Sequence, residues 1–158
     1  MVTKTEIYFA TRKTASAHVF LKKGNGKVRV NNVPIDIIEP MAAREVILAP
    51  LEISGKLRDE VDVSIRVNGG GFMGQSYAAA TALTRALIGW TKNKKEPKDH
   101  PFTKSVRSDL RKKINEFDKY LISGDARKKE PKKLGGPGAR TRKQKSYRED
   151  LDLWFIFE

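Results

Sequence analysis

The sequence contains no cysteine and only two histidines, His18 and His100. Without thiols the chain cannot form disulfides or thiolate metal sites, which is typical of a protein in a reducing cytosol. The two histidines lie far apart in the sequence, and neither has a partner at metal-ligand spacing. We therefore expect no metal centre and no cofactor.

Long apolar runs are also missing. No segment of the 158 residues is apolar over the length that a bilayer requires, and the N-terminus lacks the apolar stretch of a signal peptide. We expect no contact with membranes and a cytoplasmic location.

Acidic residues are few beside the basic ones. The chain has 32 Lys and Arg against 19 Asp and Glu, a net charge of +13. Residues 123–148 carry 10 bases and 2 acids, whereas residues 149–158 carry 4 acids and no base. Such a basic excess is tolerated best beside a polyanion: nucleic acid, an anionic membrane or an acidic protein. The density in residues 123–148 makes that segment the place to look for phosphate contacts.

The alternating residues of 61–68 predict a half-buried strand, which leads into a glycine turn and then a helix. The turn contains Gly69, Gly70, Gly71 and Gly74. From Ser76 an apolar stripe with helical spacing should pack on the sheet. Its members are Ala79, Leu83, Ala86, Leu87 and Trp90.

Other segments complete an α/β domain. Strands are expected at residues 6–10 and 17–22, with residues 27–30 as the hairpin partner of the second strand after the Asn25-Gly26 turn, and a further turn at residues 31–34. A helix should run from residue 41 to Pro50, and an amphipathic helix should bury Val106, Leu110, Ile114, Phe117 and Leu121. Its other face carries Arg107 and Arg111, which are candidates for RNA contacts or simply solvated charges.

Catalysis has little support in the sequence. Gly69, Gly71 and Gly74 match the spacing of a dinucleotide-binding fingerprint, but the second strand ending in an acidic residue about 20 positions later is missing. A tightly packed structural turn is therefore the favoured interpretation. Asp59, Glu60 and Asp62 are better explained as a solvated face than as a catalytic carboxylate pair.

The segment after Gly124 should have no structure of its own. Residues 125–148 have almost no apolar side chains, so they cannot offset the entropy cost of ordering. We expect this tail to become ordered on phosphates, with affinity that falls steeply with salt. Arg140, Arg142 and Arg148 can bind phosphate through two hydrogen bonds, and Tyr147 can stack on a base or ribose.

Five motifs occur in the order found in one known family. They are Thr11-Arg12-Lys13-Thr14-Ala15, Gly24-Asn25-Gly26-Lys27, Asn68-Gly69-Gly70-Gly71-Phe72-Met73-Gly74-Gln75, Arg85-Ala86-Leu87 and Gln144-Lys145-Ser146-Tyr147-Arg148. The match spans residues 5–148 and resembles ribosomal protein nine of the small subunit, the universal S-nine family. The last motif is similar to the archaeal and eukaryotic branch.

The resemblance implies a non-catalytic structural constituent of the small ribosomal subunit. Its fold would be a two-layer α/β sandwich of the ribosomal S-five second-domain type, with a left-handed βαβ crossover. Residues 1–124 would form the globular domain, residues 125–148 a basic extended tail and residues 149–158 an acidic-hydrophobic extension.

The implied partners are the 3′ major domain of small-subunit rRNA in the head, neighbouring head proteins and the peptidyl-site tRNA. The rRNA contacts would be Arg12 and Lys13 on the body and Arg127, Lys128, Lys129, Lys132, Lys133, Arg140, Arg142 and Lys143 on the tail. The tRNA-proximal residues would be Lys145, Ser146, Tyr147 and Arg148. The alternative from another class is a free RNA-binding protein outside the ribosome.

Residues 149–158 depart from the family pattern, which ends at or near Arg148. They add four acids and six large apolar residues, and phosphate beside an anticodon stem would repel those carboxylates. Either they pack on a neighbouring protein through Trp154, Phe155 and Phe157, or they are poorly ordered or a sequence artefact.

Overall fold

The computed structural model describes residues 6–90, 97 and 100–145. The chain divides into two units, residues 1–127 and residues 128–158. All helices and strands of the described residues lie in the first unit, and the described residues 124–145 contain neither. The mixed α/β class expected from the sequence is confirmed.

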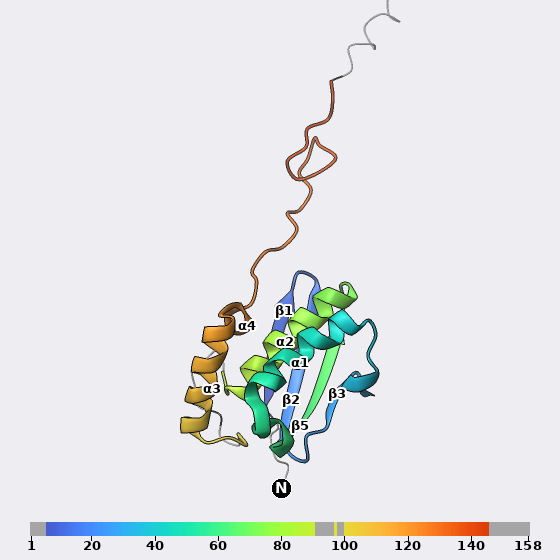
Figure 1. Ribbon diagram of the computed structural model, residues 1–158. Coiled ribbons are helices and arrows are strands. Elements are labelled where there is room, and N and C mark those ends of the chain that lie inside the picture. The colour runs from blue at the N-terminus through green and yellow to red at the C-terminus, as the bar shows by residue number, and fades with distance from the viewer. Residues whose placement is uncertain (1–5, 91–96, 98–99, 146–158) are drawn as a thin grey trace, which may run out of the picture. The chain divides into compact units, whose positions relative to one another are not determined.

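A five-stranded sheet organises the first unit (Figure 1). The strands are β1 (Ile7–Arg12), β2 (Ala15–Lys23), β3 (Val28–Val30), β4 (Val33–Pro34) and β5 (Val61–Asn68). They are hydrogen-bonded in the order β1-β2-β5-β3-β4, and all pairs are antiparallel except β3 with β5. The strand expected at residues 61–68 is confirmed as β5.

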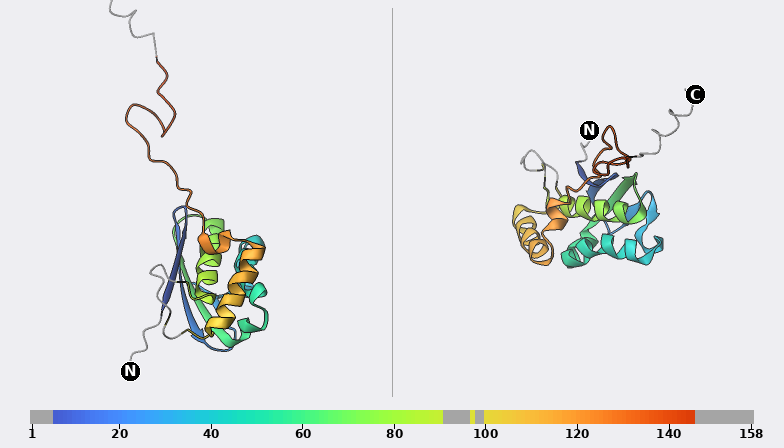
Figure 2. Two further views of the ribbon diagram at one scale, coloured as in Figure 1. Left: turned by 90° about the vertical axis from the view of Figure 1, so that its left-hand side faces the viewer. Right: turned by 90° about the horizontal axis from the view of Figure 1, so that it is seen from above.

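The helices lie on one face of this sheet (Figure 2, left). They are α1 (Met41–Ser54), α2 (Phe72–Leu87), α3 (Lys104–Phe117) and α4 (Tyr120–Ser123), with 3₁₀ turns η1 (Ile35–Ile37) and η2 (Gly55–Glu60). The core forms between the layers because strand alternation points Val19 and Ile65 toward α2, where Leu83 and Leu87 are fully buried. Ile114 of α3 joins the same cluster.

The predicted hairpin of residues 27–30 with the second strand is wrong. β5 lies between β2 and β3, so β3 pairs in parallel with β5 instead. The side chain of Asp62 explains the path, because its Oδ1 accepts hydrogen bonds from the backbone N–H groups of Asn25 and Lys27, both at 2.9 Å. The turn expected at residues 31–34 is formed by Asn31 and Asn32, both at positive φ, and it joins β3 to β4 at Val33 and Pro34.

Two helix boundaries also differ from the predictions. Pro50 does not end α1, which continues to Ser54; Pro50 and Leu51 are both buried, and this packing offsets the missing N–H of proline. α2 begins at Phe72 rather than Ser76, because Gly71 already accepts a helical hydrogen bond from the N–H of Gln75 at 3.0 Å.

Two aromatic residues predicted to face the core are exposed. Trp90 lies beyond the end of α2, where Gly89 turns the chain with φ +63°, and its side chain is 36% exposed. Phe117 is 65% exposed because α3 ends there, and Leu121 is buried from the separate helix α4. No helix in the described ranges is long and apolar enough to cross a membrane.

Candidate nucleic-acid interface

Asp125 joins two of the predicted phosphate-binding arginines. Its carboxylate accepts a hydrogen bond from Arg12 at the end of β1, and the Nε and Nη2 atoms of Arg127 donate to its Oδ2 at 2.8 and 2.6 Å. These bonds, with those from Arg127 foremost, hold the pKa of the Asp125 carboxyl far below its usual value. Asp125 therefore stays ionised and fixes both guanidinium groups at the C-terminal end of the first unit.

Two tyrosines line the groove beside this carboxylate. The groove has a volume of about 530 Å³ and also contains Arg12 and Arg127. Tyr77 on α2 is 46% exposed and Tyr120 on α4 is 62% exposed, and the Arg12 guanidinium lies 6.0 Å from the centroid of the Tyr77 ring. Flat rings beside guanidinium groups are a combination that binds nucleotide bases and phosphates.

Arg85 on α2 braces the elements from which the groove is built. Its Nε and Nη2 donate to the carbonyls of Ile122 and Ser123 at 2.9 and 2.8 Å, and its Nη1 donates to the carbonyl of Phe9 at 2.9 Å. The Trp90 ring covers the guanidinium at 4.7 Å, and burial lowers the pKa of Arg85. Arg85 thus connects β1, α2 and α4, and it positions the chain leading to Asp125.

The glycine turn packs against the β1–β2 turn, which carries the predicted body residue Lys13. Lys13 is exposed at φ +55° in the tight β1–β2 turn, next to Arg12. Gly69 and Gly70 have φ of +74° and +67°, and a Cβ on Gly69 would lie 2.7 Å from the carbonyl oxygen of Thr14. The turn therefore needs glycine so that the β1–β2 turn can approach the start of α2.

The two arginines predicted on α3 have different surroundings. Arg111 is exposed, whereas Arg107 is half-buried and its Nη1 lies close to Gly89. The Nε of Arg107 is buried without a hydrogen-bond partner among the described residues. The sequence left open whether Arg107 and Arg111 contact RNA or are simply solvated charges. Of the two, only Arg111 lies on a fully solvated face.

The second unit carries most of the predicted tail cations. Arg140 is paired with Glu130, donating from Nε to Oε2 at 3.0 Å and from Nη2 to Oε1 at 2.6 Å. This pair closes a turn around Gly135 and Gly136, and it lowers the pKa of Glu130. The remaining tail cations are exposed: Lys128, Lys129, Lys132, Lys133, Arg142, Lys143 and Lys145. Ser146, Tyr147 and Arg148 lie outside the described residues, as does the 149–158 extension.

Sequence reasoning missed Arg85, Asp125 and the two tyrosines as parts of the site. Their partners are remote in sequence: Arg12 and Asp125 are separated by 113 residues, and Arg85 and Phe9 by 76. The only sequence signal was the Arg85-Ala86-Leu87 motif, which marks Arg85 without revealing its contacts.

Fold and site together define a small, basic α/β protein with clustered cations on its body and along its C-terminal segment. The chain belongs to the family described as ribosomal protein S9/S16, which matches residues 10–148. It is therefore a structural, non-enzymatic protein, as expected from its sequence.

Three relatives illustrate the match. The small ribosomal subunit protein uS9 of Halobacterium salinarum is 43% identical over 149 residues, covering 94% of this chain and 100% of the relative. The uS9 proteins of Methanothrix thermoacetophila and Caenorhabditis elegans are 41% and 40% identical, covering 87% and 89% of this chain and 93% of each relative. The resemblance to the archaeal and eukaryotic branch is thus confirmed.

Proposed function

We propose that this chain is a structural constituent of the small ribosomal subunit that binds rRNA in the head, within the 3′ major domain. The observation that carries the proposal is a family match that includes both the α/β body and the cationic segment up to residue 148. The relatives are named as small-subunit proteins, and the net charge of +13 suits a polyanionic partner.

On the body, the proposed rRNA contacts are Arg12, Lys13, Arg107 and Arg111. Arg12 supports this role best, because Asp125 already holds its guanidinium beside the exposed ring of Tyr77. A phosphate arriving at this groove would compete with Asp125 for Arg12 and Arg127. The half-buried Arg107 would contribute mainly through its charge and its packing.

On the tail, we propose that the exposed cations contact rRNA and that residues 145–148 lie near the peptidyl-site tRNA. The tail assignment extends to Arg127, Lys128, Lys129, Lys132, Lys133, Arg140, Arg142 and Lys143. Arg140 would exchange Glu130 for phosphate, since both partners offer two oxygen acceptors to its guanidinium. Neighbouring head proteins complete the proposed set of partners, and the cytoplasm is the proposed location.

The finer description of the fold is also a proposal. We assign the S-five second-domain topology, with α1 in a left-handed crossover between β3 and β5. The parallel pairing of β3 with β5 across α1 supports a crossover of this type. The proposed organisation is a body of residues 1–124, a tail of residues 125–148 and an extension of residues 149–158.

Co-sedimentation tests the function. The chain should travel with small subunits through a sucrose gradient and remain bound at moderate salt, because many contacts must break together. A free RNA-binding protein, by contrast, should dissociate at about 0.3 M salt. Recovery of the chain only at the top of the gradient would contradict the proposal.

A further inference from the structure

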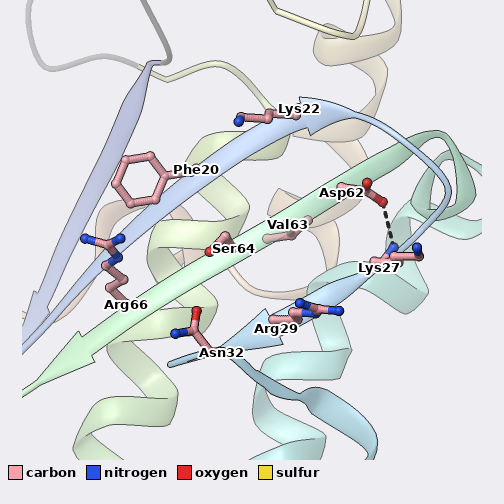
Figure 3. A pocket seen from close by; sticks show the side chains of 9 residues that line it. All are labelled: Phe20, Lys22, Lys27, Arg29, Asn32, Asp62, Val63, Ser64 and Arg66. Carbon is pink, nitrogen blue, oxygen red and sulfur yellow. Dashed lines mark hydrogen bonds between the residues drawn. The ribbon is translucent and has the colours of Figure 1, made fainter.

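One face of the sheet turns away from the helices (Figure 2, left). It carries its own set of side chains (Figure 3). Strand alternation places Phe20 and Lys22 of β2, Arg66 of β5 and Arg29 of β3 on this face. The register brings them together, because Phe20 and Arg29 both lie opposite Ser64. We call this surface the open sheet face.

The open sheet face is hollowed beside Phe20. The hollow has a volume of about 520 Å³, within the range of sites that bind small ligands. Four cations line it: Lys22, Lys27, Arg29 and Arg66. A hollow of this size admits a flat ring together with its attached phosphate.

The one carboxylate in the hollow, Asp62, does not cancel this charge. The backbone N–H groups of Lys27 and Asn25 donate to Asp62 Oδ1, both at 2.9 Å, and these bonds lower the pKa of its carboxyl. Asp62 thus uses this oxygen to hold the loop that carries Lys27. With four cations and one anion, the lining has a net positive charge.

Aromatic rings lie among these cations. The Arg66 guanidinium lies 5.6 Å from the centroid of the Phe20 ring, and the neighbouring pair of Phe9 and His18 has ring centroids 4.9 Å apart. Phe9 is 49% exposed. Stacking surfaces interleaved with phosphate-binding groups are the common feature of surfaces that bind single-stranded nucleic acid.

We propose that the open sheet face binds unpaired RNA nucleotides, with a base stacked on Phe20 and Arg66 and phosphates on Lys22, Lys27 and Arg29. The inference rests on the proposed association with RNA and assigns it a second surface, separate from the groove at Asp125. Unpaired nucleotides fit better than a duplex, because paired bases hide the rings that Phe20 would contact. A protein partner fits less well, because lysine is depleted in protein interfaces.

Site-resolved cross-linking tests the proposal. The full-length chain is mixed with a 4-thiouridine-substituted single-stranded RNA of about 12 nucleotides, irradiated and digested with trypsin. We expect nucleotide adducts on the peptides of residues 14–22 and 59–66, which contain Phe20 and Arg66. Phe20→Leu should reduce these adducts about fivefold or more, from the loss of one base stack, and leave the adducts on tail peptides unchanged.

Two matched variants control for indirect effects. Phe117→Leu removes an exposed ring from α3, and Lys56→Gln removes an exposed cation from η2, so both should leave the sheet-face adducts unchanged. Arg66→Gln should reduce the adducts on residues 14–22, unlike Lys56→Gln. Absence of adducts on both sheet-face peptides, or an equal loss in the control variants, would overturn the proposal.

Assembled small subunits separate this proposal from the proposed function. Chemical acetylation of Lys22 and Lys27 should be about fivefold or more lower in assembled subunits than in the free chain. Irradiation of the subunits should leave cross-linked nucleotides on the peptide of residues 14–22. If the chain co-sediments with small subunits but both lysines stay as reactive as in the free chain, only the sheet-face proposal fails. Cross-links from these lysines to another protein, without nucleotide adducts, would also refute it.

Discussion

Asp125 controls how the guanidinium groups of Arg12 and Arg127 are presented to a phosphate. The carboxylate holds both guanidinium groups in the free chain, so RNA must displace it or share it. The arrangement orients the cations before binding, which reduces the side-chain entropy lost when the complex forms. The same carboxylate also couples the stability of the body to pH.

The first prediction concerns this coupling. Because the folded-state pKa of Asp125 lies below its unfolded value, its contribution is present above about pH 4 and is lost as the pH falls. Asp125→Asn should therefore lower the melting temperature at neutral pH, and the difference from wild type should shrink in acid. Thermal unfolding followed by circular dichroism at several pH values measures this, with Asp109→Asn on α3 as the control. A difference that stays constant with pH would contradict the assignment.

Arg85 gives the second prediction. Lysine in its place keeps the charge but cannot donate to three carbonyl groups at once, so Arg85→Lys should lower the free energy of unfolding by about 2 kcal/mol. Urea unfolding measures the change. The exposed Arg111→Lys is the matched control and should change stability by less than about 0.5 kcal/mol. Equal effects in the two variants would mean that the carbonyl contacts of Arg85 contribute little.

Among the elements, the glycine turn between β5 and α2 has a constrained backbone, with Gly69 and Gly70 both at positive φ. Gly69→Ala would force an alanine to φ +74° and place its Cβ 2.7 Å from the Thr14 carbonyl, so we expect a loss of about 2 kcal/mol or more. Gly71→Ala is the control, because Gly71 has φ −100° and no atom within 4 Å of its added Cβ; its cost should stay below about 1 kcal/mol. Chemical denaturation of both variants compares them, and similar costs would refute the close-approach explanation.

The local sequence pattern was sufficient to predict the elements that depend on neighbouring residues alone. The alternation of residues 61–68 and the stripe from Ala79 to Leu87 predicted β5 and α2, because burial on one face imposes the period. The Asn25-Gly26 turn misled the prediction, since a turn signal says that the chain bends but not which strand it then joins. That choice depends on Asp62, 35 residues after Lys27.

The candidate site was predicted by charge but not by geometry. The charge distribution identified the tail, because clustered cations are visible in any linear reading, whereas Arg12 and Lys13 on the body came from the family resemblance. Which of them are held by a carboxylate depends on contacts such as Arg12 with Asp125 and Arg85 with Ser123, which only the fold creates. The half-buried position of Arg107, close to Gly89, could not be read from helical spacing.

At the scale of the whole molecule, a body with a core is followed by a segment whose described residues, 128–145, are not part of one. The first unit ends at Arg127, whereas the proposed body ends at Gly124. The contacts of Asp125 explain the difference, because this carboxylate binds Arg12 on β1 and so belongs to the body. Beyond it, the ion pair between Glu130 and Arg140 is made within the second unit.

Truncation tests this division. A chain ending at Arg127 should unfold cooperatively with a free energy within about 0.5 kcal/mol of the full chain, because it keeps all the residues that are buried in the described part of the chain and the contacts of Asp125. A chain ending at Gly124 should unfold at a lower urea concentration, since it loses those contacts.

The RNA affinity of the chain ending at Arg127 should depend less steeply on salt than that of the full chain, because fewer cations displace counterions. Failure of the longer truncated chain to fold would show that the tail contributes to the core, and an unchanged salt dependence would show that the tail does not bind phosphate.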